Sequence, residues 1–346
     1  MFESFFYTFI PEMHLCAYRH YSIMKKLSKI IVSVITLTII TIACNVPEKQ
    51  NATNELIVFH AGSLTKPFHE IAQSFEAENP GVRVLLEAAG SRECARKISE
   101  LNKPCDLIAT SDYAVIETLL IPDFTEWQIA FAGNEMCIAF NSSSRMKNKI
   151  NSDNWFEVLM NDSVYFGRSD PESDPCGYRT LIMFDLAEKH YRTEGLANRL
   201  KQKDPEFIRP KEVDMLALLE SHAIDYMFIY SSVAKQHKLY FIELPDEINL
   251  SNPAFTEFYA TASIELSGKS KDDRIIQKGE PMIYGISILK NAPNGDLAEE
   301  FLTFLLTSEK GMKILEQNGQ KTIVDSNSKY MEKFPSEIKK LLTNEK

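Results

Sequence analysis

Short apolar segments alternate with longer segments of helical periodicity in the first third of the chain. Residues 55–60 are apolar and end at Gly62, and residues 64–79 then carry apolar side chains at the spacing of a helix, which Pro80 ends. The same order follows once more, and a third strand comes after it. The expected strands are 55–60, 82–88 and 105–110, and the expected helices are 64–79 and 92–101. This alternation predicts a parallel sheet with crossover helices.

A second set of alternating strands and helices follows, and the last elements of the chain are expected to return to the first set. The expected strands are 134–141, 164–167, 224–230, 240–244 and 281–289, and the expected helices are 155–160, 179–191, 195–203, 213–221, 232–237 and 297–318. We therefore expect two α/β lobes, each a mostly parallel sheet flanked by helices, with the chain crossing between them twice. Lobe I is predicted at 55–134 plus 262–346, and lobe II at 135–261. A ligand cleft between such lobes is the default site.

The segment 169–179 (SDPESDPCGYR) is the most informative stretch of the chain. Two Asp-Pro steps favour extended or turn backbone, because proline disfavours a helical residue before it. The run 179–191 then has a helical pattern, so this loop is predicted to open onto a helix N-terminus. Such a terminus offers N–H groups and the positive end of a dipole, which favours a small oxyanion.

Other predicted strand ends carry similar chemistry. Ser63 and Ser91 each follow a glycine and open a helix, where a hydroxyl and N–H groups suit an anion, although either serine could be a simple N-cap. Glu212 lies at the start of the helix at 213–221. Tyr230 ends a strand and could add a phenol donor, or it could be an interface aromatic.

The N-terminal region has the layout of an export signal. Residues 24–29 are basic, residues 30–42 are apolar, and a small residue precedes Cys44. We expect 24–43 to be a lipoprotein signal peptide with Cys44 as the lipidated residue; a plain cleaved signal and an uncleaved anchor are the alternatives. Residues 44–54 are expected to be a tether, and the leader 1–23 a mis-annotated extension before Met24, or else an unusual presequence.

Charge and cysteine spacing narrow the possible functions. The 346-residue chain has a formal net charge of −10, which argues against a nucleic-acid partner but not against binding a small anion. The cysteines outside the N-terminal region have no C-x-x-C spacing, so a zinc site is not expected. Cys94 and Cys105 could pair in an exported protein, and Cys137 is expected to be a small buried hydrophobe.

Several of these segments together resemble the tungstate/molybdate-binding proteins of ABC importers, of the WtpA kind and related to ModA. The resemblance runs from about residue 55 to 319 and is carried by 61–64 (AGSL), 174–179 (DPCGYR), 209–214 (RPKEVD) and 224–234. It implies a type II periplasmic-binding-protein fold that closes over the dianion between its lobes. It also implies a monomer that is not an enzyme, needs no cofactor and delivers its ligand to a permease and an ATPase at the membrane.

The same resemblance implies a role for each candidate site residue. Gly62, Ser63 and Ser91 would donate hydrogen bonds from one lobe. Pro175 and Cys176 would line the other lobe, with the Cys176 N–H as a donor and the Tyr230 hydroxyl beside it. Asp174 and Glu212 would be the two carboxylates that approach the metal of the oxyanion itself.

Two acids in an anion site need a physical explanation, because like charges repel more strongly in a dry cleft. Tungsten(VI) and molybdenum(VI) can accept further oxygen ligands, whereas the sulfur of sulfate cannot, and a carboxylate oxygen is a suitable hard ligand. Asp174 and Glu212 would thus attract the right anion and repel sulfate. Otherwise they are only a turn residue and an acid at a helix start.

Two other functions fit parts of the pattern. In a phosphate- or sulfate-type binder, an acidic residue could accept the proton of hydrogen phosphate. In a secreted enzyme, Cys176 could be a nucleophile at a helix N-terminus with His190 or His222 as its base, although Asp174 nearby would disfavour a thiolate.

Overall fold

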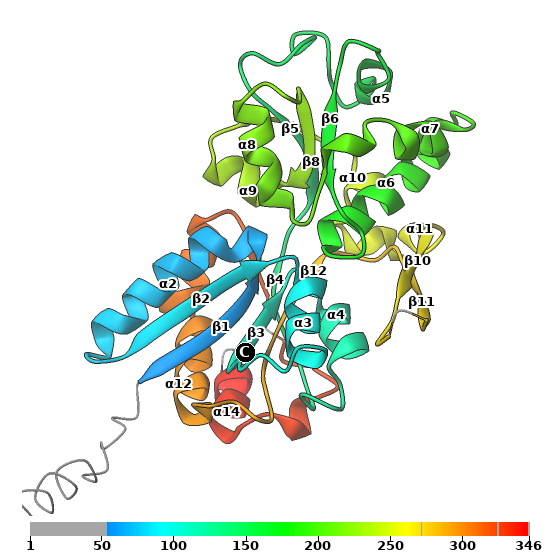
Figure 1. Cartoon of the computed structure of the whole chain (residues 1–346). Coiled ribbons are helices and arrows are strands. Elements are labelled where there is room, and N and C mark those ends of the chain that lie inside the picture. The colour runs from blue at the N-terminus through cyan, green and yellow to red at the C-terminus, as the bar shows by residue number, and fades with distance from the viewer. Residues whose placement is uncertain (1–53, 271, 324, 345–346) are drawn as a thin grey trace, which may run out of the picture. The chain divides into compact units, whose positions relative to one another are not determined.

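The computed structural model describes residues 54–344 except 271 and 324. The expected leader, signal peptide and tether, with Cys44, lie outside the described residues. Within the described part of the chain, no helix is both long and apolar enough to cross a membrane. Two large sheets, each covered by helices, and a smaller two-stranded sheet organise residues 54–344 (Figure 1).

The first sheet has six strands in the order β13-β4-β12-β3-β1-β2. Its strands are β1 (Glu55–Ala61), β2 (Arg83–Ala89), β3 (Leu107–Thr110), β4 (Ile129–Gly133), β12 (Ile283–Ile288) and β13 (Lys321–Thr322). The helices around it are α2 (Thr65–Glu78), α3 (Ser91–Ser99), α4 (Tyr113–Leu119), α12 (Gly295–Leu306), α13 (Lys313–Gln317) and α14 (Ser336–Asn344). We call this lobe I.

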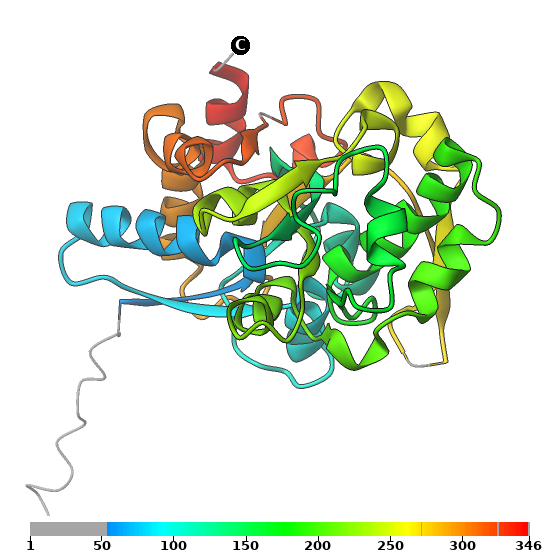
Figure 2. The same cartoon turned by 90° about the horizontal axis from the view of Figure 1, so that it is seen from above.

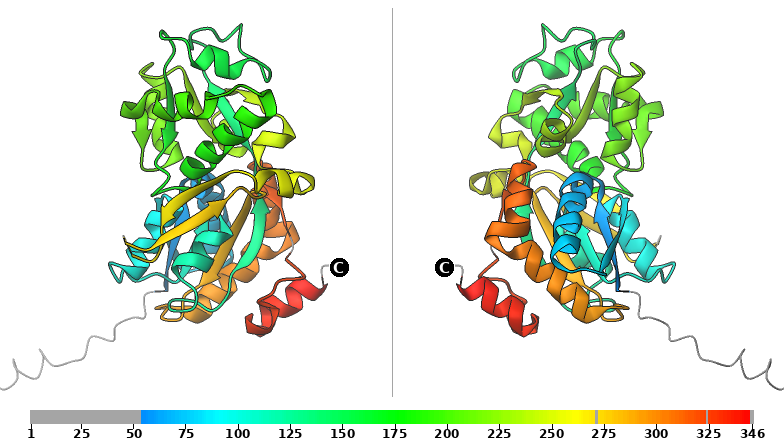
Figure 3. Two further views of the ribbon diagram at one scale, coloured as in Figure 1. Left: turned by 90° about the vertical axis from the view of Figure 1, so that its right-hand side faces the viewer. Right: turned by 90° about the vertical axis from the view of Figure 1, so that its left-hand side faces the viewer.

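Alternation along β1 explains why helices cover both faces of this sheet. Leu56 and Val58 are fully buried and belong to the cluster that includes Phe68 and Phe75 of α2. Phe59 points the other way, into a cluster with Ile98 of α3. Both faces are therefore apolar, as expected for a strand with helices on either side. Farther along, α14 packs on α12 (Figure 3).

The second sheet, in lobe II, has five strands in the order β7-β6-β8-β5-β9. Its strands are β5 (Met136–Phe140), β6 (Phe166–Ser169), β7 (Ile208–Arg209), β8 (Tyr226–Tyr230) and β9 (Tyr240–Glu243). Its helices are α5 (Trp155–Leu159), α6 (Pro175–Tyr191), α7 (Leu196–Gln202), α8 (Met215–Glu220), α9 (Ser231–Gln236), α10 (Asp246–Asn249) and α11 (Thr256–Tyr259). The short helix α10 packs beside α6 (Figure 2).

The two-lobed α/β fold is confirmed, but the sheets are mixed rather than mostly parallel. In lobe I, β1 pairs parallel with β2 and β3, whereas β12 runs antiparallel to β3 and β4. In lobe II, β5 runs antiparallel to β8 and β9. The chain crosses between the lobes just before β5 and again before β12. Each of these strands therefore starts at the edge where the parallel strands of its sheet end, and it runs in the opposite direction. The exact lobe boundaries remain a prediction.

Three further features differ from the sequence pattern. Helix α6 begins at Pro175, four residues before the predicted start at Arg179, because Asp174 is extended and caps it. The pattern also missed α4 and β4. It gave no sign of the antiparallel hairpin of β10 (Ser263–Ser267) and β11 (Arg274–Lys278) in the stretch that returns to lobe I.

The β10–β11 hairpin links both lobes through one residue, Ser267. Its backbone N–H lies 3.2 Å from both carboxylate oxygens of Glu172, in the loop before α6. Its hydroxyl accepts a hydrogen bond from Nη2 of Arg96 in α3 at 2.8 Å, and its carbonyl accepts one from Arg92. The hairpin therefore holds the loop that opens α6 against the start of α3.

Candidate polar site between the lobes

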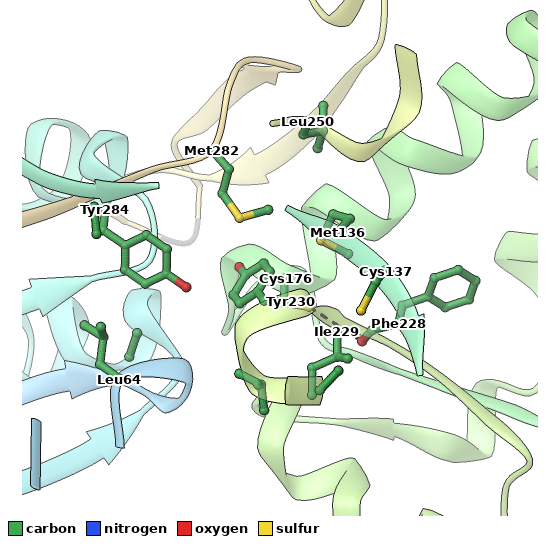
Figure 4. Close-up of a cluster of buried hydrophobic side chains, with 14 of the residues drawn as sticks. Leu64, Met136, Cys137, Cys176, Phe228, Ile229, Tyr230, Leu250, Met282 and Tyr284 are labelled. Atoms are coloured by element: carbon green, nitrogen blue, oxygen red, sulfur yellow. Dashed lines mark hydrogen bonds between the residues drawn. The ribbon is translucent and has the colours of Figure 1, made fainter. Parts of the chain in front are cut away.

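All the site residues predicted from the sequence are buried where strand ends of the two sheets meet. They are Gly62, Ser63 and Ser91 in lobe I, and Asp174, Pro175, Cys176, Glu212 and Tyr230 in lobe II. Hydrogen bonds and close contacts cross from one set to the other. Tyr230 of lobe II also packs edge-on against Tyr284 of lobe I, with ring centroids 6.2 Å apart (Figure 4).

Asp174 links the start of α6 to Glu212. Its extended backbone (φ −141°, ψ 131°) precedes Pro175 at the first helical position, as proline requires. One carboxylate oxygen accepts the N–H of Cys176 at 3.3 Å, and the other accepts the N–H of Glu212 at 3.0 Å. Burial raises the pKa of Asp174, and these hydrogen bonds oppose that rise.

Glu212 is a buried acid whose carboxylate has few compensating contacts. Among the described residues, neither of its carboxylate oxygens has a partner in a well-aligned hydrogen bond. Burial raises the pKa of Glu212 well above its ordinary value, and the charge of neighbouring Asp174 raises it further. Gly62 makes room for this carboxylate, because a Cβ there would lie 3.1 and 3.2 Å from its two oxygens. Gly62 of lobe I is thus in contact with Glu212 of lobe II.

Three hydroxyl groups surround this junction, and each accepts a hydrogen bond from another buried group. The Ser63 hydroxyl accepts from the Tyr284 hydroxyl at 2.9 Å. The Ser91 hydroxyl accepts from the N–H of Ser111 at 3.0 Å. The Tyr230 hydroxyl accepts from Nη1 of Arg179 at 3.2 Å. The Ser63 hydroxyl therefore keeps its own proton to donate, whereas the Tyr230 hydroxyl also donates to the Ser111 hydroxyl at 3.4 Å and the Ser91 hydroxyl lies 3.2 Å from it.

An ion pair between Arg179 of lobe II and Asp112 of lobe I crosses the junction. Neither residue was predicted from the sequence to belong to the site. Nη2 of Arg179 lies 3.1 Å from a carboxylate oxygen of Asp112, which also accepts the hydroxyl of Tyr178. Nη1 of Arg179 donates to the carbonyl of Ser111 at 2.6 Å. Ser111-Asp112 follows β3 as Gly62-Ser63 follows β1, so the repeated position after a strand was an available signal.

At the start of α3, two of the N–H groups expected from the sequence to suit an anion already have partners. The N–H groups of Arg92 and Glu93 both donate to the carbonyl of Ser173 in lobe II, at 3.1 and 3.2 Å. Gly90 permits this approach, because a Cβ there would lie 2.3 Å from the same oxygen. Two N–H groups of this helix start are therefore used to join the lobes. The Cys176 N–H is also occupied, because it donates to Asp174 within lobe II.

The cysteine chemistry is that of buried, reduced thiols. Cys94, Cys105, Cys137 and Cys176 are all free and buried, so Cys94 and Cys105 are not joined. Sγ of Cys176 lies 3.7 Å from the carbonyl of Phe228 as its donor (Figure 4). Burial raises the pKa of this thiol well above its ordinary value, and the charges of Asp174 and Glu212 raise it further. Across the described residues, no group of three His, Cys, Asp or Glu side chains could hold a metal ion.

A groove on lobe I is unsuited to an anion. Its volume is about 570 Å³, and it lies between α2, α12 and α14. Its lining includes the acidic residues Glu78, Asp296, Glu299, Glu300 and Glu337. These charges would repel an oxyanion, so the buried junction between the lobes is the better candidate.

The two-lobed α/β fold with buried polar residues between its lobes is accompanied by similarity to proteins of one family. Residues 56–321 match the family of bacterial extracellular solute-binding proteins, and the chain is a member of that family. A solute-binding protein of Petrotoga mobilis whose solute is not stated is 47% identical over 294 residues, or 85% of this chain and 91% of the relative. The molybdate/tungstate-binding protein WtpA of Thermococcus kodakarensis is 39% identical over 329 residues, covering 86% and 92%.

A solved structure supports the fold independently of close sequence similarity. The periplasmic molybdate-binding protein of Azotobacter vinelandii superimposes with a TM-score of 0.55 at 15% identity, covering 77% of this chain and 98% of that one. The relatives found by these comparisons are solute-binding proteins rather than enzymes.

Proposed function

We propose that this chain binds tungstate or molybdate at the junction between its lobes and is not an enzyme. Asp174 and Glu212 would approach the metal centre of the oxyanion. Ser63, Ser91 and Tyr230 would donate hydroxyl hydrogen bonds to its oxygens, with Gly62, Pro175 and Cys176 forming the remaining wall. About 40% identity to proteins named for molybdate and tungstate supports this choice of ligand.

The single observation that carries the proposal is the buried carboxylate of Glu212. An isolated buried carboxylate is costly unless it is paired, hydrogen-bonded or bound to a metal. Glu212 is 1% exposed, has no well-aligned hydrogen-bond partner among the described residues and lies beside a second acid, Asp174. A hexavalent metal centre that accepts carboxylate oxygen would stabilise both acids. Sulfate offers no such centre, so the two acids would reject it.

Calorimetric titration with tungstate, molybdate, sulfate and phosphate tests the ligand assignment directly. We expect tight binding of tungstate or molybdate and at least tenfold weaker binding of sulfate. Replacing both acids, Asp174→Asn with Glu212→Gln, should weaken tungstate binding and reduce the discrimination against sulfate. Unchanged affinity and selectivity in the double variant would contradict the proposed role of the two carboxylates. Binding of phosphate without binding of tungstate would overturn the proposed class of ligand.

Cysteine-dependent catalysis is the weaker alternative. A nucleophilic thiol needs a lowered pKa, whereas the pKa of the Cys176 thiol is raised by burial and by two neighbouring acids. Of the two candidate bases, His222 lies at the surface, where its Nδ1 is 2.8 Å from the Ser143 hydroxyl. A Cys176→Ala variant that retains its oxyanion affinity would exclude a required thiol.

Export and delivery complete the proposed role. The chain would be exported and anchored through lipidated Cys44, and it would act as a monomer. Lobe I would comprise 55–134 and 262–346, and lobe II 135–261. The protein would pass its ligand to the permease and ATPase of an ABC importer. Membership of an extracellular solute-binding family supports the extracytoplasmic location. Metabolic labelling with a fatty acid, lost on Cys44→Ala, tests the anchor.

A further inference from the structure

The amide of Asn134 has one orientation, and this fixes the direction of a chain of hydrogen bonds. Its Oδ1 accepts the N–H of Glu135 at 3.0 Å and faces the N–H of Ser232 at 3.4 Å. Its NH₂ group must therefore point the other way, where it donates to the Tyr284 hydroxyl at 3.0 Å and the Ser232 hydroxyl at 2.7 Å. Reversing the amide would place N–H against N–H.

This orientation determines what the Tyr284 hydroxyl does. It accepts from Asn134, so its own proton is directed to the Ser63 hydroxyl at 2.9 Å. All three residues are buried, at 3%, 0% and 1% exposure for Asn134, Tyr284 and Ser63, so water does not compete for these bonds. The Ser63 hydroxyl, which already accepts a proton from Tyr284, is left to donate its own.

Each of the other two hydroxyls at the junction accepts from a group that can only donate, and each also lies near the Ser111 hydroxyl. Ser91 accepts from the backbone N–H of Ser111, and Tyr230 accepts from the guanidinium of Arg179. Neither a backbone N–H nor a guanidinium can accept a hydrogen bond in return. Tyr230 donates to the Ser111 hydroxyl at 3.4 Å, and the Ser91 hydroxyl lies 3.2 Å from the same group. Both distances exceed the usual range of an O–H···O hydrogen bond, so an anion would be a better acceptor for either proton.

We propose that Tyr284, held by Asn134, is a positioning residue that presents the Ser63 hydroxyl as a donor to the bound anion, and that Arg179 does the same for Tyr230. This inference rests on the proposed function, because the anion is the acceptor toward which the hydroxyls point. Donors fixed before binding do not have to reorient on binding, which favours affinity. Tyr284 acts through Ser63 and need not touch the anion itself.

A double-mutant cycle separates positioning from general support of the fold. Tyr284→Phe removes one oxygen and keeps the ring, so we expect tungstate binding to weaken threefold to tenfold, about the contribution of one hydrogen bond. In a Ser63→Ala background the same change should have no further effect, because the hydroxyl that it orients is gone. An equal loss in both backgrounds, or no loss in the wild-type background, would overturn the proposal.

Tyr226→Phe is the matched control. The Tyr226 hydroxyl donates to the carbonyl of Arg145 at 2.6 Å within lobe II. The substitution therefore also removes one hydroxyl hydrogen bond from a buried tyrosine. It should leave tungstate affinity unchanged. A second cycle, Arg179→Lys with Tyr230→Phe, tests the same logic and keeps a positive charge beside Asp112. Additive losses in that cycle would refute the role of Arg179.

The two proposals fail in different ways. If the wild-type protein binds none of the four oxyanions in calorimetry, the proposed function is wrong. If it binds tungstate but both cycles are additive, the function stands and the positioning role is wrong. Thermal unfolding without anion, measured for every variant, establishes that each one is folded before its affinity is compared.

Discussion

Arg179 of α6 and Asp112 at the start of α4 form an ion pair that joins the two lobes. The atoms Nη2 and Oδ2 are 3.1 Å apart, and both side chains are at most 3% exposed. Burial lowers the pKa of the guanidinium, but the charge of Asp112 together with the neighbouring Tyr230 and Tyr178 raises it above its ordinary value, so Arg179 stays charged. A buried pair of this kind contributes little net stability, but breaking it leaves an uncompensated charge.

Asp112→Asn should therefore destabilise the protein strongly. Removing one partner of a buried pair costs about 3–5 kcal/mol, because Arg179 would remain buried and charged. Urea unfolding followed by circular dichroism measures the change in the free energy of unfolding. The control is Glu337→Gln, which breaks an exposed pair with Lys340 and should change that free energy by less than about 1 kcal/mol. Equal effects of the two substitutions would contradict the interpretation.

Glu212→Gln should have opposite effects on stability and binding. The amide removes a buried carboxyl whose pKa is raised by burial and by Asp174, so the ligand-free protein should become more stable by about 1 kcal/mol. Tungstate binding should weaken, because the proposed oxygen ligand is weaker as an amide. The two readouts are the melting temperature without anion and the calorimetric affinity. A variant that loses both stability and affinity would indicate a purely structural glutamate.

Gly62→Ala should weaken anion binding through the contact with Glu212. The added Cβ would lie within 3.2 Å of both carboxylate oxygens and of Cγ2 of Val213, so these groups must shift. Overpacking of this kind costs about 1–3 kcal/mol, or roughly a fivefold to hundredfold loss of affinity. Gly295→Ala is the matched control, because its Cβ would meet nothing within 4 Å. Equal affinities of the two variants would argue against close packing at Gly62.

Glu280 should make stability depend on pH near neutrality. Burial, followed by the charge of Asp112, raises its pKa to about 7, while Tyr113 donates to it at 2.9 Å and the Arg179 charge opposes the rise. The folded state therefore binds this proton more tightly than the unfolded chain, whose ordinary value is 4.5. This contribution is fully present below pH 4.5 and is lost as the pH rises to about 7.

Glu280→Gln should remove this part of the pH dependence. The decline in the free energy of unfolding between pH 5 and pH 8 should become smaller in the variant than in the wild-type protein. Urea unfolding at several pH values measures the slope. Glu265→Gln, an exposed acid 61% accessible on the β10–β11 hairpin, should leave the slope unchanged. An identical slope for Glu280→Gln would assign the dependence to other groups.

The sequence predicted the fold class, and it placed most candidate residues at the ends of strands or the starts of helices, because both follow from local patterns. Apolar runs followed by Gly62-Ser63 or Gly90-Ser91 identify strand ends, and strand ends of a parallel set share one edge. The mixed strand direction was missed, because an apolar strand has the same pattern in either direction. The β10–β11 hairpin is mostly exposed and polar, so its sequence lacks the periodicity that the other strands show.

The partners of the site residues were less accessible to sequence reasoning. The link from Arg179 to Asp112 spans 67 positions, and the link from Tyr284 to Ser63 spans 221. Such pairs depend on how the lobes meet, which no local pattern encodes. The start of α6 at Pro175 was predictable, since an Asp-Pro step often begins a helix, but Gly177 made the first turn appear to be a loop.

The direct crossing from lobe I to lobe II is very short. Strand β4 ends at Gly133 and β5 begins at Met136, so only Asn134 and Glu135 lie between the sheets. Three peptide steps of about 3.8 Å cannot let the lobes separate far at this point, so any opening must be a rotation about it. Asn134 also donates to Tyr284, which donates to Ser63, and therefore the pivot of any such rotation and the proposed donor to the anion are parts of one hydrogen-bonded chain.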